Sequence, residues 1–219
     1  MKKPIVIGFA AKKSSGKSTT IWHLSEFFDN CVLIDADWTK SDLSAFGELR
    51  KKITKLDNTP VVIEKAANAA HIKQIVKRHE DKDYIFVDTA GNFENIARMR
   101  EIYDLCDMLI LPVSVGVNSL SFGEVLKFVH GKHNYRVLIT NEGRAQAKRR
   151  EQLRESLERN PKIRVLKRSY PTASLIEDAA MQGTRLGEGF GIRRGLQELA
   201  YKRLADEIKA ELKKDFENE

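Results

Sequence analysis

Residues 5–20 read Ile-Val-Ile-Gly-Phe-Ala-Ala-Lys-Lys-Ser-Ser-Gly-Lys-Ser-Thr-Thr. An apolar strand, a loop of small residues and Gly-Lys-Ser at the start of a helix form the layout of a phosphate-binding loop. The backbone N–H groups of such a loop and of the helix N-terminus converge on one point, where anions bind. A lysine there adds charge for the β- and γ-phosphates, and the following hydroxyl can ligate Mg²⁺. The residues predicted to bind nucleotide are Lys13, Ser14, Ser15, Gly16, Lys17, Ser18 and Thr19.

Two further apolar runs end in aspartate. The first, residues 32–37, ends in Asp35-Ala36-Asp37, and the second, residues 84–91, carries Asp88 after four apolar residues. Ligands of open parallel sheets lie beyond the carboxyl ends of the strands. The second run has a Walker B pattern, so we expect Asp88 and Ser18 to hold Mg²⁺. One such aspartate alone could equally cap the helix or turn that follows it, but three of them beside a phosphate loop favour chemistry.

Strands and helices alternate along the chain. Apolar runs with strand character lie at 4–10, 31–36, 60–64, 83–88, 107–113 and 134–140, with a weaker one at 163–167. Segments with helical spacing separate them, which predicts an α/β fold of the P-loop NTPase type, a mostly parallel sheet with helices on both faces. We expect a single domain over residues 1–219, a C-terminal helix over about 192–214 and a frayed tail from Lys213 to Glu219.

The composition limits the possible classes of protein. The 219 residues are 42% hydrophobic and 32% charged, with a net charge of +7, which is typical of a globular chain. No apolar run approaches the roughly 20 residues that span a membrane, and the early first strand leaves no room for a signal peptide, so we expect a cytoplasmic protein. No Cys/His cluster has metal-site spacing, and the five scattered histidines, His23 among them, read as surface or capping residues.

The positive charge is concentrated in one segment. Residues 143–203 hold 15 Lys/Arg and 7 Asp/Glu, a net charge of +8. A basic face of this kind favours an anionic polymer as partner, whereas solvated helix faces would explain the same charges without any function. The predicted contacts to nonspecific DNA are Arg144, Lys148, Arg149, Arg150, Arg154, Arg193 and Arg194.

A second lysine, Lys12, lies five residues before Lys17. This spacing resembles the deviant Walker A loop of the ParA/MinD family of dimeric ATPases. The paired aspartates, the strand at 107–113 with its proline and the strand before Asn141 resemble the same family, so the likeness runs from about residue 4 to about residue 212. The chain departs from the family at Lys13 and Ser14, which replace two loop glycines, and at residues 38–39, which read Trp-Thr instead of Pro-Gln.

The resemblance implies a mechanism and partners. It implies that ATP and Mg²⁺ are sandwiched in a homodimer, with Lys12 reaching the phosphates of the partner protomer. Asp37 would orient the attacking water, Asp35 would support the metal shell and Asn141 would contact adenine. The short length resembles the small partition-type members without an N-terminal helix-turn-helix. These imply DNA partition or cargo positioning on the nucleoid and a small DNA-binding or adaptor protein that stimulates hydrolysis.

Three other interpretations share these features. Ser14-Ser15-Gly16-Lys17-Ser18 also looks like the loop of small-molecule kinases, which would require a phosphate acceptor. An accessory ATPase of conjugative transfer would have the same fold. A MinD-like membrane switch needs an apolar terminal helix, and the tail at 213–219 is too short and too acidic for one, so no membrane partner is expected.

Overall fold

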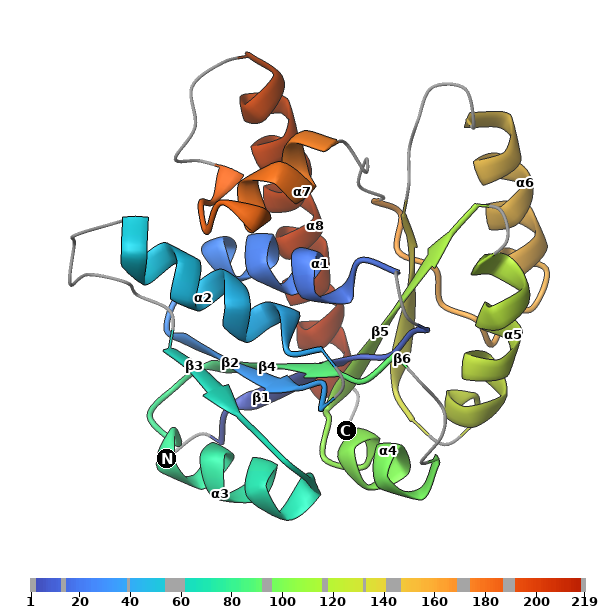
Figure 1. Cartoon of the computed structure of the whole chain (residues 1–219). Coiled ribbons are helices and arrows are strands. Elements are labelled where there is room, and N and C mark those ends of the chain that lie inside the picture. Colours follow the sequence, from blue (N-terminus) through green and yellow to red (C-terminus); the bar gives the residue numbers. More distant parts are fainter. Residues whose placement is uncertain are drawn as a thin grey trace.

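The computed structural model describes residues 3–12, 15–38, 40–53, 62–91, 96–115, 118–131, 133–140, 147–168, 174–186 and 192–217. In this part of the chain six strands form one parallel sheet in the order β3-β2-β4-β1-β5-β6 (Figure 1). The strands are β1 (Ile5–Phe9), β2 (Cys31–Ala36), β3 (Val62–Lys65), β4 (Tyr84–Thr89), β5 (Met108–Ser114) and β6 (Tyr135–Thr140).

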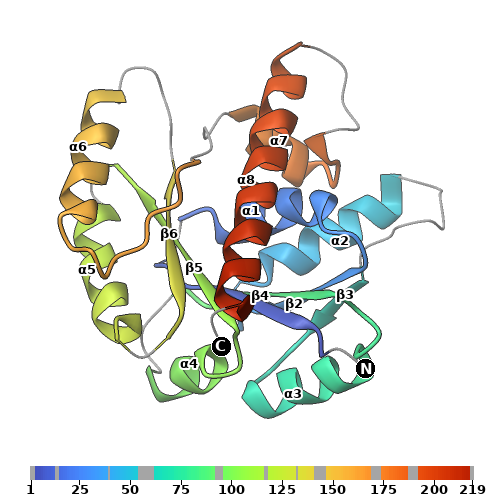
Figure 2. The ribbon, with the colours of Figure 1, turned by 180° about the vertical axis from the view of Figure 1, so that it is seen from behind.

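Helices cover both faces of this sheet. They are α1 (Lys17–Leu24), with the short 3₁₀ turn η1 (Ser25–Phe27), α2 (Asp42–Ile53), α3 (Ala69–Arg78), α4 (Ile96–Tyr103), α5 (Asn118–Val129), α6 (Ala147–Glu158), α7 (Ser174–Met181) and α8 (Ile192–Glu217). Side chains of α1, α2, α7 and α8 pack into one apolar core, and Figure 2 shows α8 lying along this face of the sheet. Side chains of α3, α4, α5 and α6 pack into two cores on the opposite face.

Most strand residues are buried, which is why the strand sequences are mainly apolar. Every residue of β1, β2 and β6 is buried. At the carboxyl edge of the sheet, Asp35 of β2 lies in register with Asp88 of β4, and β4 pairs with β1 next to the loop that leads into α1. The parallel register therefore brings the start of α1 and both aspartate runs to one edge.

The weak strand predicted at 163–167 does not form. Val165 makes a single bridge to Val137 of β6, while residues 163–167 otherwise run as irregular chain. The backbone N–H of Leu166 donates to the carbonyl of Val137 and the N–H of Val137 donates to Arg164. A segment with one bridged residue at the sheet edge has the same apolar pattern as a short strand. For this reason the sequence predicts a strand where the structure has a single bridge.

The tail predicted to fray is helical through Glu217. Arg136 of β6 is only 1% exposed, and its guanidinium lies 2.7 Å from Asp215 and 2.9 Å from Glu211. Arg164 also pairs with Asp215, at 2.9 Å. A buried arginine needs charged partners, so these ion pairs hold the end of α8 against the sheet.

Candidate nucleotide-binding site

The loop between β1 and α1 turns sharply at Gly16. Its φ of 78° is in the left-handed region that favours glycine. The carbonyl of Gly16 accepts hydrogen bonds from the backbone N–H of Thr20, at 2.8 Å, and from its hydroxyl, at 2.6 Å. The first N–H groups of α1 have no partner within the helix, so the turn leaves them available to an anion.

A cavity of about 470 Å³ lies at this helix start. Its floor is formed by residues 15–19, and the rest of its lining comes from the turn after β2 and from α2 and α7. The lining residues beyond the loop are Asp37, Lys40, Asp42, Phe46, Glu177 and Met181. The loop and Asp37, predicted separately from the sequence, therefore share one cavity.

Lys17 and Asp88 form the buried electrostatic centre of the site. Lys17 is 6% exposed and Asp88 is fully buried. Burial lowers the pKa of Lys17, against the opposing effect of the Asp88 and Asp37 carboxylates. Burial likewise raises the pKa of Asp88 to about 7, against the opposing effects of Lys17 and Ser18. A bound phosphate would offset the desolvation of the Lys17 ammonium, and a bound cation would offset the desolvation of the Asp88 carboxylate.

The residues predicted to hold Mg²⁺ lie in contact. The hydroxyl of Ser18 donates to Oδ2 of Asp88 at 2.5 Å. The other carboxylate oxygen, Oδ1, is buried and has no hydrogen-bond partner among the described residues. A hydroxyl and a carboxylate with one unpaired oxygen match the oxygen ligands of Mg²⁺, which otherwise keeps waters and phosphate oxygens. The described part of the chain holds no cluster of three His, Cys, Asp or Glu side chains that could bind a metal ion.

Asp35 and Asp37 play different parts in the turn after β2. Asp35 is 3% exposed, and its Oδ2 accepts from the backbone N–H of Ser44, at 2.9 Å, and from its hydroxyl, at 2.6 Å. Its Oδ1 accepts from the N–H of Asp37 at 3.2 Å. Asp35 therefore braces the turn and the start of α2, while Asp37 lines the cavity.

Lys12 lies within the described part of the loop and pairs within its own chain. Its Nζ is 2.7 Å from Oε2 of Glu124 on α5, with side chains 42% and 61% exposed. Exposed pairs of this kind contribute little to stability. Lys12 can therefore leave Glu124 at small cost.

Several predicted residues lie outside the described ones. These are Lys13, Ser14, Asn141 and Arg144, and for Arg193 and Arg194 only the helical backbone is described. The predicted base contact and the two loop positions that differ from the ParA/MinD pattern therefore remain predictions.

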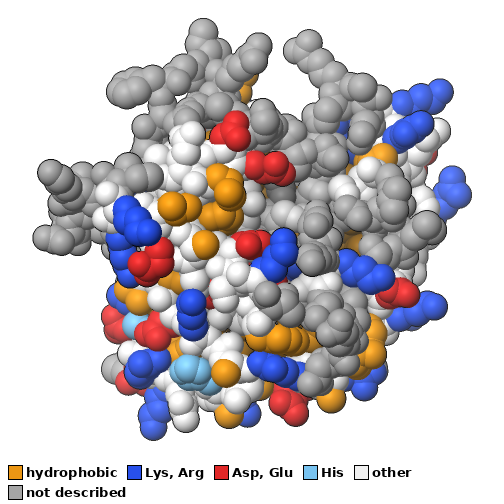
Figure 3. Space-filling view, viewed as in Figure 1, with side chains coloured by type: hydrophobic (Ala, Val, Ile, Leu, Met, Phe, Trp, Pro, Cys, Tyr) orange, Lys and Arg blue, Asp and Glu red, His pale blue; other side chains and the backbone are white. Residues whose placement is uncertain are grey.

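The predicted basic surface is divided by the fold. Lys148 and Arg149 are exposed and Arg150 is partly exposed at the start of α6, and Figure 3 shows Lys and Arg side chains along the side of the molecule that carries α6. Arg154 is 14% exposed, and its guanidinium donates to the carbonyls of Leu166 and Lys167 at 3.0 and 3.2 Å. Arg154 thus ties α6 to the irregular chain after it. Arg150, one turn earlier and also only partly exposed, lies on the same side of the helix, as the spacing of four residues predicts.

His23 was expected at the surface and is instead fully buried. Its Nε2 lies 3.0 Å from the carbonyl of Ile176, so the ring joins α1 to α7. Burial lowers its pKa to about 4. His23 lies between the apolar Trp22 and Leu24, which favours burial, but no local pattern indicates the contact to Ile176, because α7 is about 150 residues further along the chain.

Comparison with known proteins identifies the fold. Neither a family model nor a curated protein sequence matches the chain. Among solved structures, apo McdA from Cyanothece superimposes with a TM-score of 0.70 at 17% identity, covering 93% of this chain and 99% of that one. The chain has the fold of the ParA/MinD ATPases.

Two more structures support the same assignment. The MinD cell division protein of Aquifex aeolicus matches with a TM-score of 0.68 at 17% identity, covering 91% of this chain and 96% of MinD. A putative plasmid partition protein from Borrelia burgdorferi, bound to AMPPNP, matches with a TM-score of 0.64 at 15% identity, covering 95% of this chain and all of that one. At these identities the likeness establishes the fold, and the roles of residues are argued from the site itself.

Proposed function

We propose that this protein binds ATP with Mg²⁺ and hydrolyses it slowly. The main support is that the buried Lys17 lies beside the Ser18–Asp88 pair, at a helix N-terminus that opens into a cavity of about 470 Å³. Nucleotides in related folds support it, since McdA has been solved with ATP and MinD from Pyrococcus horikoshii with Mg-ADP.

Each residue has a distinct part in this proposal. Lys17 and the N–H groups of the loop hold the phosphates. Ser18 and Asp88 hold Mg²⁺, which neutralises charge on the β- and γ-phosphates when bound. Asp37, on the turn that Asp35 braces, orients the attacking water.

The test measures nucleotide binding and phosphate release separately. Lys17→Ala should abolish ATP binding, because the phosphates lose their nearest cation. Asp37→Ala should bind ATP with near-normal affinity and release no phosphate. Hydrolysis by Asp37→Ala at the wild-type rate would disprove its role, and release that depends strictly on a small-molecule acceptor would favour a kinase.

We also propose that ATP joins two protomers and that Lys12 then leaves Glu124 for the phosphates of the partner. A contact to the γ-phosphate disappears on hydrolysis, which makes association a switch. The proposed task of this switch is partition of DNA or positioning of a cargo on nonspecific DNA, with a small adaptor protein that stimulates hydrolysis. A role in conjugative transfer would use the same chemistry. No helix in the described part of the chain is both long and apolar enough to span a bilayer.

The DNA contact is proposed to lie at the start of α6, on the exposed Lys148 and Arg149 and the partly exposed Arg150. Phosphate contacts carry no sequence preference, so unrelated duplexes should bind alike. The slope of log affinity against log salt should be about −0.9 for each phosphate contacted. ATP should strengthen binding, because a dimer doubles the number of contacts.

Fluorescence anisotropy with a random-sequence duplex across a salt series measures this binding. Replacing Lys148, Arg149 and Arg150 together by Glu should abolish it. The matched control reverses three exposed charges on another side of the molecule, at Lys65, Lys73 and Lys77, and should weaken binding much less. Equal effects of the two triple variants would remove α6 from the mechanism.

A further inference from the structure

The residue after Asp37 makes an unusual contact. The guanidinium carbon of Arg98 lies 3.8 Å from the centroid of the Trp38 ring. Trp38 follows β2 and Arg98 lies in the first turn of α4, the helix after β4. The stack therefore connects the turn that carries Asp37 to the helix that follows Asp88. A guanidinium stacked on an indole is among the stronger cation–π arrangements.

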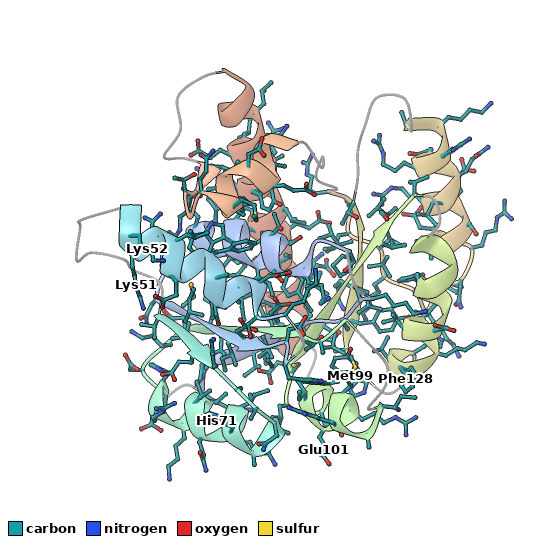
Figure 4. All side chains as sticks on the ribbon, in the orientation of Figure 1. Lys51, Lys52, His71, Met99, Glu101 and Phe128 are labelled. Carbon is teal, nitrogen blue, oxygen red and sulfur yellow. The ribbon has the colours of Figure 1, made fainter. Side chains whose placement is uncertain are left out.

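The Arg98 side of this contact is rigid. Met99, Ile102 and Tyr103 of α4 are 1–2% exposed and pack under the sheet. Figure 4 shows Met99 directed toward Phe128 of α5 and Glu101 directed away from the body of the molecule. With its inner face held by these side chains, α4 is a fixed support for Arg98.

The Trp38 side is a tight, strained turn. Oδ1 of Asp37 accepts from the N–H of Lys40 at 3.3 Å, and its carbonyl accepts from the N–H of Ser41 at 3.2 Å. Ser41 has a φ of 54°, which an L-residue rarely adopts. The Trp38 side chain is partly buried against the two apolar cores that lie between the sheet and helices α3 to α6. A strained turn of this kind needs outside contacts to keep one conformation, and the Trp38 ring supplies them.

We propose that the Trp38–Arg98 stack is a positioning pair, which holds Asp37 in the orientation that hydrolysis requires. The inference rests on the proposed ATPase function and names a residue, Arg98, that does not line the nucleotide cavity among the described residues. The stack acts on the turnover step and not on ATP binding, because the phosphate loop itself is held by α1 and Gly16.

The kinetic test compares Arg98→Leu and Trp38→Leu with wild type. Each should lower kcat about tenfold or more, since a small misplacement of a reacting group can cost about a hundredfold. The KM for ATP should stay within about threefold of the wild-type value. Trp38→Phe keeps an aromatic face and should retain most of the rate. Arg98→Lys keeps the charge without the planar stack and should fall between the two.

Arg100→Leu is the matched control. Arg100 lies two residues further along α4, and its guanidinium is 5.2 Å from the ring of Phe128, away from the Asp37 turn. It should leave both kcat and KM unchanged. A loss of rate in Arg100→Leu equal to that in Arg98→Leu would show that any change on α4 slows the enzyme, which would overturn the proposal.

The double variant Trp38→Leu/Arg98→Leu tests whether the two residues act as a unit. It should be no slower than the slower single variant, because either substitution alone already removes the stack. A double variant whose fold-loss of kcat equals the product of the two single losses would overturn the inference. An unchanged kcat in both single variants would do the same. If wild type itself hydrolysed no ATP, the proposed function would fail instead, so the two failures are distinguishable.

Fluorescence gives a readout that needs no turnover. The chain has two tryptophans, and Trp22 is fully buried, so quenching by acrylamide reports on Trp38. Arg98→Leu should increase quenching and Arg100→Leu should not, with Trp38→Phe giving the Trp22 baseline. Quenching unchanged by Arg98→Leu would mean that the stack does not form in solution and would overturn the proposal.

Discussion

His23 shows how one buried residue couples stability to pH. With its folded pKa near 4 and an ordinary value of 6.5, the unfolded chain binds a proton between these pH values while the native ring does not. Its contribution to stability is therefore complete above about pH 6.5 and is lost as the pH falls toward 4. Asp88 acts in the opposite direction, because its raised pKa favours proton binding by the native state between about 4 and 7.

The effect of His23 can be isolated by comparing wild type with His23→Gln. The difference in their free energies of unfolding should shrink by about 2 kcal/mol between pH 7 and pH 5, while the Asp88 contribution cancels. Urea denaturation at several pH values measures it. A constant difference for His23→Gln would mean that the ring is not held neutral.

Individual site residues were predictable where they belong to a local pattern. Ser18 and Asp88 meet as expected, because a loop after β1 and the end of β4 are neighbours in any sheet of this order. The partners of Lys12 and Trp38 were not predictable, since Glu124 and Arg98 are single charged residues on distant helices. Arg136 is a lone charge in an apolar strand, and nothing local indicates that Asp215 would neutralise it.

At the scale of elements, the turn after α7 determines how closely two helices approach. Gly183 has a φ of 65°, and a Cβ there would collide with the backbone of Leu49 and Arg50 in α2. Gly131, after α5, has a φ of 74° and open space around it. Both positions favour glycine because their φ angles are positive. At Gly183 the missing Cβ also lets the turn pack closely against the backbone of α2.

This difference predicts the stability of three glycine variants. Gly131→Ala should lower the free energy of unfolding by about 1 kcal/mol, the cost of a left-handed L-residue. Gly183→Ala should lower it considerably more, because α2 and α7 must also separate. Gly123→Ala, inside α5 with nothing within 4 Å, should stabilise slightly. Thermal or urea unfolding provides the values, and equal losses at Gly131 and Gly183 would contradict the packing argument.

The elements themselves were largely predictable from the sequence. The apolar runs predicted as six strands match β1 to β6 to within one or two residues, with residues 60–61 outside the described part. The reason is that the strands other than β3 are almost entirely buried and therefore mainly apolar. The two errors, at 163–167 and in the tail, lie at the sheet edge and the chain end. There a few long-range contacts decide the structure, and local composition does not report them.

For the molecule as a whole, we propose that ATP controls the association of two protomers. Lys12 lies beside the phosphate loop and is held by an exposed ion pair to Glu124 that is easily broken. Because this pair contributes little, Glu124→Gln should lower the ATP concentration needed for association only slightly. Lys12→Ala should leave nucleotide binding intact and prevent association.

Light scattering measures this association in Asp37→Ala, in which we expect turnover to be blocked. With Mg-ADP the mass should be that of the 25.0 kDa monomer. With Mg-ATP it should double, and Lys12→Ala in the same background should remain monomeric while still binding ATP. A monomer in Mg-ATP would show that ATP does not join two protomers, and a dimer that persists without Lys12 would show that Lys12 does not hold them together.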